Sequence, residues 1–419
     1  MRFDTIIIGG GLSGLTAGIA LAEKGQRCAI ISTGGSALHF CTGSFDLLGY
    51  TGDEIEVKEP LKAISSLPDT HPYAKLGAEK VAAYAEQLKA LFAQTGIPFR
   101  GDAGKNHYRI TPMGELKPTW LTLDEFAMVE NPEKLPWKKV SIVNITGFLD
   151  FHTQFIANGL EKAGIRCVIS NCTIPELERL RESPTEMRSA NIARELDKPE
   201  VLEKLADALS HHTYDADTLL LPAVFGIKHF NVISRLRKLM NFPVSVIPTL
   251  PPAVAGARIH AALCRNFREQ GGCYMLGDTV LAGKISNGKL TQVTTVNHGD
   301  IALEADHFIL ATGNVFSQGL TATSDSLYEP VFGLDVKYEK DRSKWFDTNF
   351  FQSQPYMEYG VNIDDAFRGK INGEKITNLY VVGSALAGAN SLKEASGAGI
   401  AMISALHVAD EIENRRKNG

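Results

Sequence analysis

The stretch that decides the fold is residues 3–46, FDTIIIGGGLSGLTAGIALAEKGQRCAIISTGGSALHFCTGSFD. Residues 4–8 form a short β-branched apolar run, which is typical of a buried parallel strand. Glycines 9, 11 and 14 then follow in the spacing G-x-G-x-x-G. In this pattern Gly9 makes the tight turn, Gly11 lets the backbone approach a pyrophosphate, and Gly14 lets the next helix pack closely on the sheet. A helix over about 13–24 and a strand over 27–32 complete a βαβ unit that predicts dinucleotide binding.

The second strand of this unit ends without the acidic residue that usually holds an adenosine ribose. Ser32 and Thr33 stand at that place. A serine hydroxyl can still hydrogen-bond a sugar hydroxyl, but a neutral group binds it less strongly than a carboxylate does. The identity of the nucleotide therefore stays open, as does the alternative of a βαβ turn that holds no ligand.

Composition limits the classes of protein to consider. The chain has 419 residues, of which 44% are hydrophobic, enough for two or three globular domains. Its 43 basic and 48 acidic residues give a net charge of -5, which argues against a nucleic-acid-binding protein. No run of about 18 apolar residues is present, so no membrane span is expected. Because a strand begins at residue 3, no signal peptide is expected either, and we predict a cytoplasmic protein.

The cysteines and histidines do not suggest a metal centre. Six cysteines are scattered along the chain without a C-x-x-C pair, and iron–sulfur clusters need clustered thiolates. The pair His211 and His212 has no partner at metal-ligand spacing, which favours a surface position. We therefore predict no metal site, and any iron–sulfur cluster that receives electrons from this chain must belong to another subunit.

Several later segments return to the pattern of the first unit. Buried strands are predicted at 138–145, 306–311 and 377–384, and a helix at about 396–415 begins with small residues. The charge-rich segment 176–209 predicts a pair of helices on another domain. We thus expect an α/β protein with a Rossmann-like FAD/NAD(P)-binding fold and a second, inserted α+β domain. The binding domain would comprise residues 1–50, 138–175, 256–315 and 371–419, and the inserted domain 51–137, 176–255 and 316–370.

Small polar residues and glycines after these strands are the candidate cofactor-binding residues. A loop of this kind can line the pocket of an aromatic ring system, and a helix that starts with small residues can stabilise negative charge on a cofactor. The alternative for the loop after the second strand is an ordinary surface loop. The candidates are Gly9, Gly11, Gly14, Ser32, Thr33, Ser36, Thr42, Gly43, Ala311, Thr312, Gly313, Gly383, Ser384 and Gly397.

Together, the N-terminal glycine motif, the strand end at residues 311–313 (ATG) and the strand at 378–383 (NLYVVG) carry a family resemblance. The chain resembles the flavoproteins that include the flavoprotein subunits of fumarate reductase and succinate dehydrogenase. Residues 36–40 (SALHF), 147–151 (GFLDF) and 251–258 (PPAVAGAR) are most similar to the B subunits of bacterial anaerobic glycerol-3-phosphate dehydrogenases.

This resemblance implies a three-subunit enzyme that oxidises sn-glycerol 3-phosphate to dihydroxyacetone phosphate and passes electrons to quinone, with fumarate or nitrate as the terminal acceptor. It implies a flavoprotein assigned FMN, a partner A subunit that carries FAD, and an iron–sulfur C subunit that anchors the pair at the membrane. The chain would then be peripheral on the inner face of the cytoplasmic membrane through its complex.

Two departures from the family pattern concern the flavin. The acid after the second strand is replaced by Ser32 or Thr33, and the usual Gly-Asp of the C-terminal strand is Gly383-Ser384. Loss of the first acid weakens the grip on adenosine, which favours FMN, with FAD as the alternative. Loss of both is also compatible with a subunit that binds flavin weakly.

Oxidation of a secondary alcohol by a flavin requires a base for the hydroxyl proton. If this chain performs that chemistry, His39, Arg258 and His260 are the candidates for base and phosphate clamp; structural roles are the alternative for each. The resemblance places the dehydrogenation more naturally on the A subunit. Two other functions remain open: an independent fumarate-reductase-like FAD oxidoreductase, and a non-catalytic assembly subunit that keeps the fold.

Overall fold

The computed structural model describes residues 1–52 and 54–418 and divides the chain into two compact units. Unit 1 comprises residues 1–37, 46–91 and the chain from residue 262 onward, and unit 2 comprises residues 38–45 and 92–261. Each unit is built around a parallel sheet of its own.

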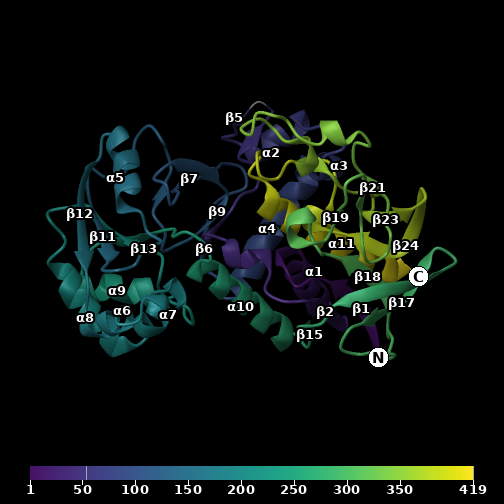
Figure 1. The fold of residues 1–419 in the computed structure, drawn as a ribbon, viewed down its shortest axis with the longest axis horizontal. Coiled ribbons are helices and arrows are strands. Elements are labelled where there is room, and N and C mark those ends of the chain that lie inside the picture. The colour runs from purple at the N-terminus through teal and green to yellow at the C-terminus, as the bar shows by residue number, and fades with distance from the viewer. Residues whose placement is uncertain (53, 419) are drawn as a thin grey trace. The chain divides into compact units, whose positions relative to one another are not determined.

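Five parallel strands form the centre of unit 1, in the order β15-β2-β1-β18-β24. The apolar run at the N-terminus forms the middle strand, because its side chains are buried on both faces, as for Ile6 and Ile7. The strands are β1 (Arg2–Ile8), β2 (Cys28–Ser32), β15 (Cys273–Leu276), β18 (Leu303–Leu310) and β24 (Glu374–Val381). Since all five run the same way, their carboxyl ends meet at one edge of the sheet (Figure 1).

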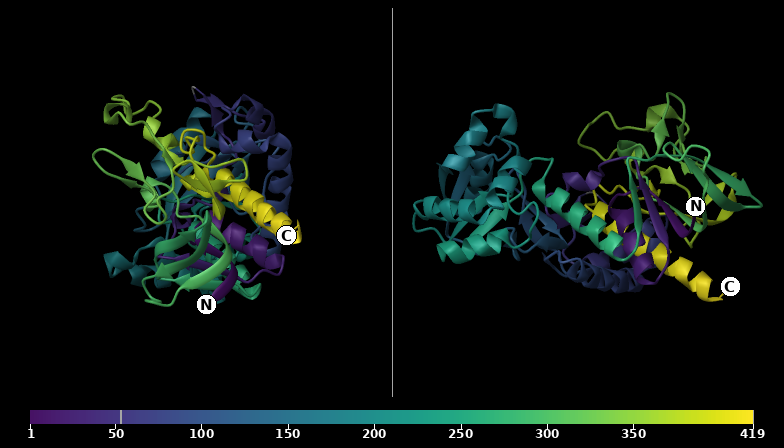
Figure 2. Two further views of the ribbon diagram at one scale, coloured as in Figure 1. Left: turned by 90° about the vertical axis from the view of Figure 1, so that its right-hand side faces the viewer. Right: turned by 90° about the horizontal axis from the view of Figure 1, so that it is seen from below.

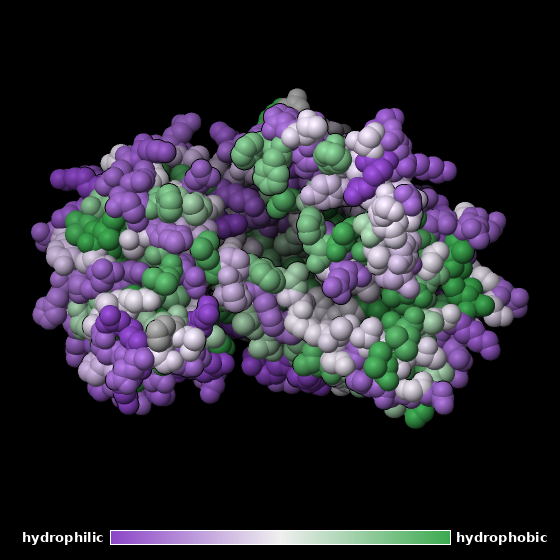
Figure 3. Space-filling model, in the orientation of Figure 1, coloured by the Kyte–Doolittle hydropathy of each residue, from purple (hydrophilic) through white to green (hydrophobic). Residues whose placement is uncertain are grey.

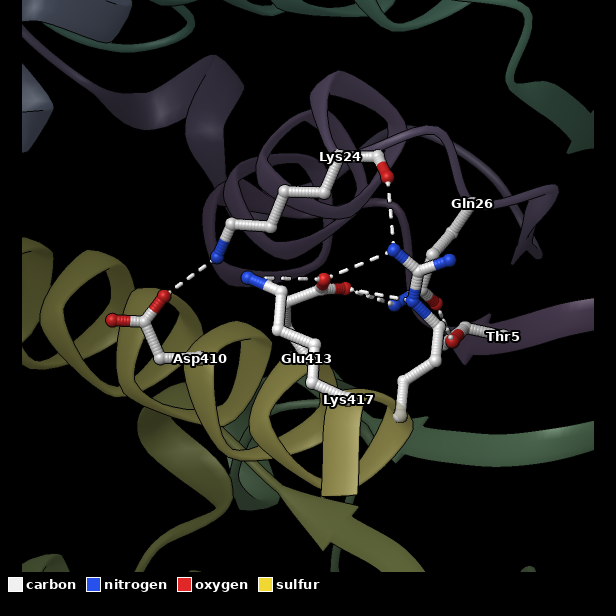
Figure 4. Close-up of polar contacts among 7 residues, drawn as sticks. Thr5, Lys24, Gln26, Asp410, Glu413 and Lys417 are labelled. Carbon is white, nitrogen blue, oxygen red and sulfur yellow. Dashed lines mark hydrogen bonds and ion pairs between the residues drawn. The ribbon is translucent and has the colours of Figure 1, made fainter. Parts of the chain in front are cut away.

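Two helices, α1 (Leu12–Glu23) and α11 (Gly397–Asn418), lie side by side against this sheet (Figures 1 and 2). Ion pairs join their C-terminal parts: the Nζ of Lys24 lies 2.6 Å from the Oδ1 of Asp410. Next to this pair, the Gln26 amide donates to Glu413 and accepts from the hydroxyl of Thr5 (Figure 4). The contacts of Glu413 thus tie the last helix of the chain to its first βαβ unit.

An antiparallel extension completes unit 1. A hairpin of β16 (Val280–Ser286) and β17 (Lys289–Thr295) turns at Asn287 and Gly288, which both have positive φ, as a type I′ turn requires. Strand β17 joins β18, and β23 (Arg368–Ile371) joins β24. The remaining elements of unit 1 are β4 (Tyr50–Thr51), β5 (Ile55–Glu56), α2 (Pro60–Ala63), α3 (Pro72–Leu76), β19 (Thr321–Ala322), β20 (Leu327–Tyr328), β21 (Val336–Lys337) and β22 (Gly360–Val361).

Unit 2 contains a second parallel sheet, in the order β12-β11-β13-β14. Helix α5 connects β11 to β12 on one side of the sheet, and α9 connects β13 to β14 on the other side. Both connections join parallel strands and are expected to be right-handed, which places α5 and α9 on opposite faces of the sheet. Helix α8 packs on α9. The elements are β11 (Lys139–Ile145), α5 (Thr153–Lys162), β12 (Arg166–Cys172), α6 (Pro175–Arg181), α7 (Ser189–Leu196), α8 (Pro199–Ser210), β13 (Thr218–Pro222), α9 (Val232–Met240) and β14 (Val244–Ile247).

Two small antiparallel sheets complete unit 2, in the orders β3-β9-β6 and β10-β7-β8. Their strands are β3 (Ser44–Phe45), β6 (Phe99–Arg100), β7 (His107–Ile110), β8 (Leu116–Thr119), β9 (Leu121–Leu123) and β10 (Met128–Val129). The helices α4 (Ala78–Gln94) and α10 (Val254–Glu269) each begin in one unit and end in the other along the sequence.

The strand pairing corrects the predicted domain boundaries. Residues 138–175 were assigned to the nucleotide-binding domain, but β11 and β12 pair with each other and with β13, so this segment builds the sheet of unit 2. Residues 38–45 and 256–261 also belong to unit 2, whereas 54–91 and 316–370 belong to unit 1. Unit 2 combines one wholly parallel sheet with two small antiparallel sheets. Apolar runs look alike in any buried parallel strand, so they do not reveal which sheet a strand joins.

Glycine and proline set several helix boundaries. Gly77, whose φ is +81°, separates α3 from α4. The charge-rich segment 176–209 holds three helices in place of two, and the third begins with Pro199 at its first position. No helix among the described residues is long and apolar enough to cross a membrane.

The surface visible in Figure 3 mixes hydrophilic and hydrophobic residues on each unit. On unit 1, hydrophobic residues gather over the strands β17 and β18 and their neighbours, where Leu281 and Val296 are more than half exposed. Much of the surface of any folded protein is contributed by apolar atoms.

Candidate functional site

The candidate site in unit 1 is the edge where the parallel strands end. The loops that leave β1, β2, β18 and β24 begin at residues 9, 33, 311 and 382. From β1 the chain passes to β2 on one side, while β18 lies on the other side, so β1 marks a topological switch point. Open α/β sheets bind ligands at the carboxyl ends of strands at such a point.

Gly9 and Gly14 serve the packing of this edge. Gly9 has φ +115°, and a Cβ on it would overlap the carbonyl of Ala311. A Cβ on Gly14 would overlap the carbonyl oxygen of Gly9. Both glycines therefore allow the β1–α1 turn to close tightly against its neighbours, as the motif predicts.

Gly11 differs because the space beside it is open. A Cβ there would meet only the Cβ of Ser36, at 3.8 Å. Gly11 is the N-cap of α1, the helix start has no side-chain cap, and its first turn carries no acidic residue. The uncapped N–H groups and the helix dipole make this end suitable for a phosphate group.

The loop after β2 is held by its own hydrogen bonds. The hydroxyl of Ser32 is nearly buried and donates to the carbonyl of Gly34 at 3.1 Å. The hydroxyl of Thr279 donates to that of Thr33 at 3.1 Å. Tyr274 on β15 donates its hydroxyl to the carbonyl of Gly10 at 3.3 Å, and burial raises the pKa of Tyr274 to about 12. Sequence reasoning missed Tyr274, because only the fold brings β15 next to the glycine turn.

The strand ends at β18 and β24 lie side by side, as their pairing up to Leu310 and Val381 requires. A Cβ on Gly313 would come within 3.3 Å of the Ser384 hydroxyl, and Gly313 has φ +85°. The Thr312 hydroxyl is buried and has no hydrogen-bond partner among the described residues. Gly383 has φ +74°, and its N–H donates to Ser404 of α11. The structure thus brings together the predicted residues of both loops.

The start of α11 is held by contacts with residues near the N-terminal half of unit 1. The N–H of Gly399 donates to the carbonyl of Asp46, and a Cβ on Gly399 would overlap the hydroxyl of Tyr73. Gly397 has room for a Cβ, whose nearest neighbour would be Ser391 at 3.5 Å. The small residues at the helix start therefore serve two purposes: Gly399 serves packing, and Gly397 leaves space.

A histidine–glutamate pair fixes the loop that leads into α11. The Nε2 of His71 lies 3.1 Å from the Oε2 of Glu394, which also accepts from the hydroxyl of Ser396. The Nδ1 of His71 accepts from the N–H of Tyr73, so the proton resides on Nε2 and points to Glu394. Burial alone would raise the pKa of Glu394, but the hydrogen bond with His71 lowers it. Sequence reasoning missed this pair, because 323 residues separate its members.

Two predicted cofactor residues, Thr42 and Gly43, belong to unit 2. Gly43 has φ +94°, and a Cβ on it would lie 2.5 Å from the ring of Phe126. Its glycine character is explained by this packing. A cofactor role for either residue stays a prediction.

Two of the predicted catalytic residues meet in unit 2. The rings of His39 and His260 are both partly exposed and pack edge to face, with their centroids 4.9 Å apart. The main chain supports this contact, since the N–H of Ala253 donates to the carbonyl of His39 at 3.1 Å. Gly256 permits it, because a Cβ there would overlap the carbonyl oxygen of Leu38.

The third predicted catalytic residue, Arg258, is buried and already paired. Its guanidinium forms a two-pronged ion pair with Glu125, donates to the carbonyl of Phe225 at 3.4 Å and lies 4.4 Å from the ring centre of Phe230. Burial raises the pKa of Glu125, and the charge of Arg258 opposes that rise. The Nε of Arg258 has no partner among the described residues. In this arrangement Arg258 stabilises unit 2, and its role as a phosphate clamp stays a prediction.

The residues of unit 1 fit a flavin nucleotide. The open space beside Gly11 and the uncapped start of α1 suit its phosphate, and the unpartnered Thr312 hydroxyl lies at the same sheet edge. No group of three or more histidine, cysteine, aspartate or glutamate side chains that could hold a metal ion occurs among the described residues.

Comparisons with known proteins show the family of the whole chain. The profile of the family described as "FAD binding domain" matches residues 4–400. A relative in Yersinia enterocolitica, named as the B subunit of anaerobic glycerol-3-phosphate dehydrogenase, is 42% identical over 416 residues, which cover 98% of each chain. A relative of the same name in Pectobacterium carotovorum is 40% identical over 415 residues, covering 98% of this chain and 99% of its own. The chain belongs to this B-subunit family.

Members of this family are FAD-binding-domain proteins, so the predicted flavoprotein fold and the family resemblance are confirmed. The expectation of FMN is not supported by the family's description, which names FAD. Solved structures also match at low similarity. A 3-ketosteroid dehydrogenase from Sterolibacterium denitrificans is 10% identical with a TM-score of 0.45, covering 99% of this chain and 100% of its own. The quinol fumarate reductase flavoprotein of E. coli is 10% identical with a TM-score of 0.44, covering 100% of this chain and 71% of its own.

Proposed function

We propose that this chain is the flavin-binding B subunit of an anaerobic sn-glycerol-3-phosphate dehydrogenase complex. The observation that carries the proposal is full-length similarity to proteins of that name, joined to an open, uncapped glycine turn at the sheet edge. The complex would oxidise glycerol 3-phosphate to dihydroxyacetone phosphate and pass the electrons to quinone.

In this proposal the residues of unit 1 bind and orient the flavin. The N–H groups at the start of α1 would hold a phosphate of the flavin beside Gly11. The positive end of the α11 helix dipole would stabilise negative charge on the flavin. His71 and Glu394 keep the loop before α11 in place. A bound flavin supplies the capacity to accept a hydride from an alcohol carbon and to pass electrons on one at a time.

FAD is the cofactor we propose, because the family is described by it. One observation favours FMN: the Ser32 hydroxyl, which stands where an acid holds the adenosine ribose, donates to the carbonyl of Gly34. Because the Ser32 hydroxyl uses its proton in this hydrogen bond, it cannot donate to a ribose oxygen. The site would then bind the adenosine part of FAD weakly.

His39 and His260 are the candidate proton acceptors if the dehydrogenation takes place on this chain. A partly exposed, neutral imidazole can accept the hydroxyl proton of a secondary alcohol. If the FAD-carrying A subunit performs the dehydrogenation, this chain instead passes electrons toward the iron–sulfur C subunit. Its place would be the inner face of the cytoplasmic membrane, reached through that complex.

The test is to purify the chain alone, record its visible absorption spectrum, release the chromophore by heat and identify it by chromatography. One flavin per chain that becomes reduced by glycerol 3-phosphate only after the A subunit is added would support electron transfer. Reduction by the chain alone would place the dehydrogenation here. A colourless chain that is still required for assembly would contradict the proposal and leave the assembly role.

A further inference from the structure

A pocket of about 420 Å³ lies in unit 2 at the amino ends of its parallel strands. Thr218 begins β13, Val244 begins β14, and Trp137 comes two residues before β11. Parallel sheets usually bind ligands at the opposite edge. The pocket is lined by Arg100, Asp124, Trp137, Thr218, Arg237, Pro243, Val244 and Ser245.

Arg237 of α9 is held in the pocket wall by its backbone contacts. Its Nε donates to the carbonyl of Val244 at 2.6 Å, and its Nη2 lies 3.4 Å from the carbonyl of Glu125. No protein acceptor for its Nη1 occurs among the described residues. Burial lowers the pKa of Arg237, and the like charge of Arg100 also lowers it, whereas the charges of Asp124 and Glu125 raise it. The two backbone carbonyls thus hold the guanidinium in place at the pocket.

Arg100 supplies a second cation at the same wall. Its Nη2 donates to the carbonyl of Asp124 at 2.6 Å, and the side chain is exposed. The carboxylate of Asp124 is the only acidic side chain in the lining as described. The two guanidinium groups and one carboxylate of the lining give the pocket a net charge of one positive unit.

The lining also includes apolar residues. The partly exposed Trp137 and the ring of Pro243 border the same pocket, whose volume is in the range of small-molecule sites. An aromatic side chain beside a cation suits a ligand with a charged head and an apolar body.

We propose that this pocket binds a small organic carboxylate, with its monovalent head at Arg100 and Arg237 and its apolar body against Trp137. A single net positive charge matches a carboxylate better than a divalent phosphate. The site is independent of the flavin site, since every lining residue belongs to unit 2.

The experiment titrates the full-length chain with cyclohexanecarboxylate at constant ionic strength, following tryptophan fluorescence and melting temperature. The neutral analogue cyclohexanol and inorganic phosphate are the comparison probes. Variants are Arg100→Gln, Arg237→Gln, Asp124→Asn and Trp137→Phe, and Arg235→Gln on the same helix is the matched control because it is outside the lining.

We expect saturable binding of the carboxylate, weakened about tenfold in Arg100→Gln by loss of a charge-assisted hydrogen bond. Asp124→Asn should bind more tightly, Trp137→Phe should lose the fluorescence change, and Arg235→Gln should match the natural chain. Because the Arg100 side chain donates to a single carbonyl among the described residues, its variant remains informative even if Arg237→Gln unfolds. Absent binding, equal binding of cyclohexanol, tighter binding of phosphate, or an unchanged affinity in both Arg100→Gln and Asp124→Asn would overturn the proposal.

Discussion

The two units each contain a parallel sheet with a topological switch point, yet the loops at their carboxyl edges differ. In unit 1 the turn from β1 to α1 is three residues long, and the space beside Gly11 is open. In unit 2 the turns after β11 and β13 are closed by neighbouring side chains. A Cβ on Gly147 would lie 2.9 Å from the Nε of Arg181, and one on Gly226 would lie 2.8 Å from the Nη1 of Arg258.

This difference teaches that a parallel sheet alone does not make a nucleotide site. The sheet fixes where loops converge, but backbone access decides whether a phosphate can reach the helix N–H groups. In unit 2 the Glu125–Arg258 pair occupies the corresponding region with buried charge.

The largest effect is expected from Glu125→Gln. Removing the carboxylate leaves the buried guanidinium of Arg258 without its counter-charge, and breaking such a pair costs about 3–5 kcal/mol. Urea unfolding should show this loss, whereas Glu130→Gln, at an exposed position nearby, should change stability by less than about 0.5 kcal/mol. Equal stability of the two variants would show that the pair does not hold unit 2 together.

A smaller loss of stability is expected from Gly9→Ala. The residue has φ +115°, and the new Cβ would overlap the carbonyl of Ala311, so we expect a loss of about 2–3 kcal/mol. Thermal unfolding measures this loss, and flavin content should fall with it. A variant that melts like the natural chain would contradict the tight closure of the β1–α1 turn.

Gly11→Ala should separate binding from folding. The added methyl group meets only Ser36 at 3.8 Å, so stability should fall by no more than about 1 kcal/mol, the cost of replacing a glycine N-cap. Flavin affinity should fall by about tenfold or more, because the methyl group occupies the approach to the backbone. Fluorescence titration with flavin measures this change, and Gly104→Ala in unit 2 is the control. Unchanged affinity in Gly11→Ala would place the phosphate elsewhere.

The smallest effect concerns acid stability at Glu413. The hydrogen bond from Arg416, with its charge, lowers the pKa of Glu413 from the usual 4.5 to about 2. A lowered pKa in the folded chain stabilises it above the usual pKa, and that contribution is lost as pH falls from about 4.5 toward 2. Glu413→Gln should therefore flatten the fall in melting temperature over this range and cost roughly 1 kcal/mol at neutral pH, after screening by solvent. The control Glu411→Gln should show the same dependence of melting temperature on pH as the natural chain. The same dependence in Glu413→Gln would contradict the lowered pKa of Glu413.

Local patterns allowed much of unit 1 to be predicted. The glycine spacing placed β1, α1 and β2 within two residues of their observed bounds. The strand ends at 311–313 and 383–384 were also found, and the structure brings them together. These signals succeed because turns and parallel strands depend on few neighbouring residues.

Long-range pairing could not be predicted in the same way. The apolar run of β11 resembles those of unit 1, so its place in the other sheet was missed. Glu125 and Arg258 are 133 residues apart, and nothing in the local sequence of either one identifies the other. His71 and Glu394 present the same difficulty across 323 residues. Such contacts arise from tertiary packing, which a single sequence does not display.

The most direct test of the central claim is a titration of the flavin-free chain with FAD, followed by the quenching of flavin fluorescence. The account predicts one saturable site per chain, weakened in Gly11→Ala and unchanged in Gly104→Ala. A chain that binds no FAD and no FMN, alone or within its complex, would contradict the claim that the β1–α1 edge is a flavin site.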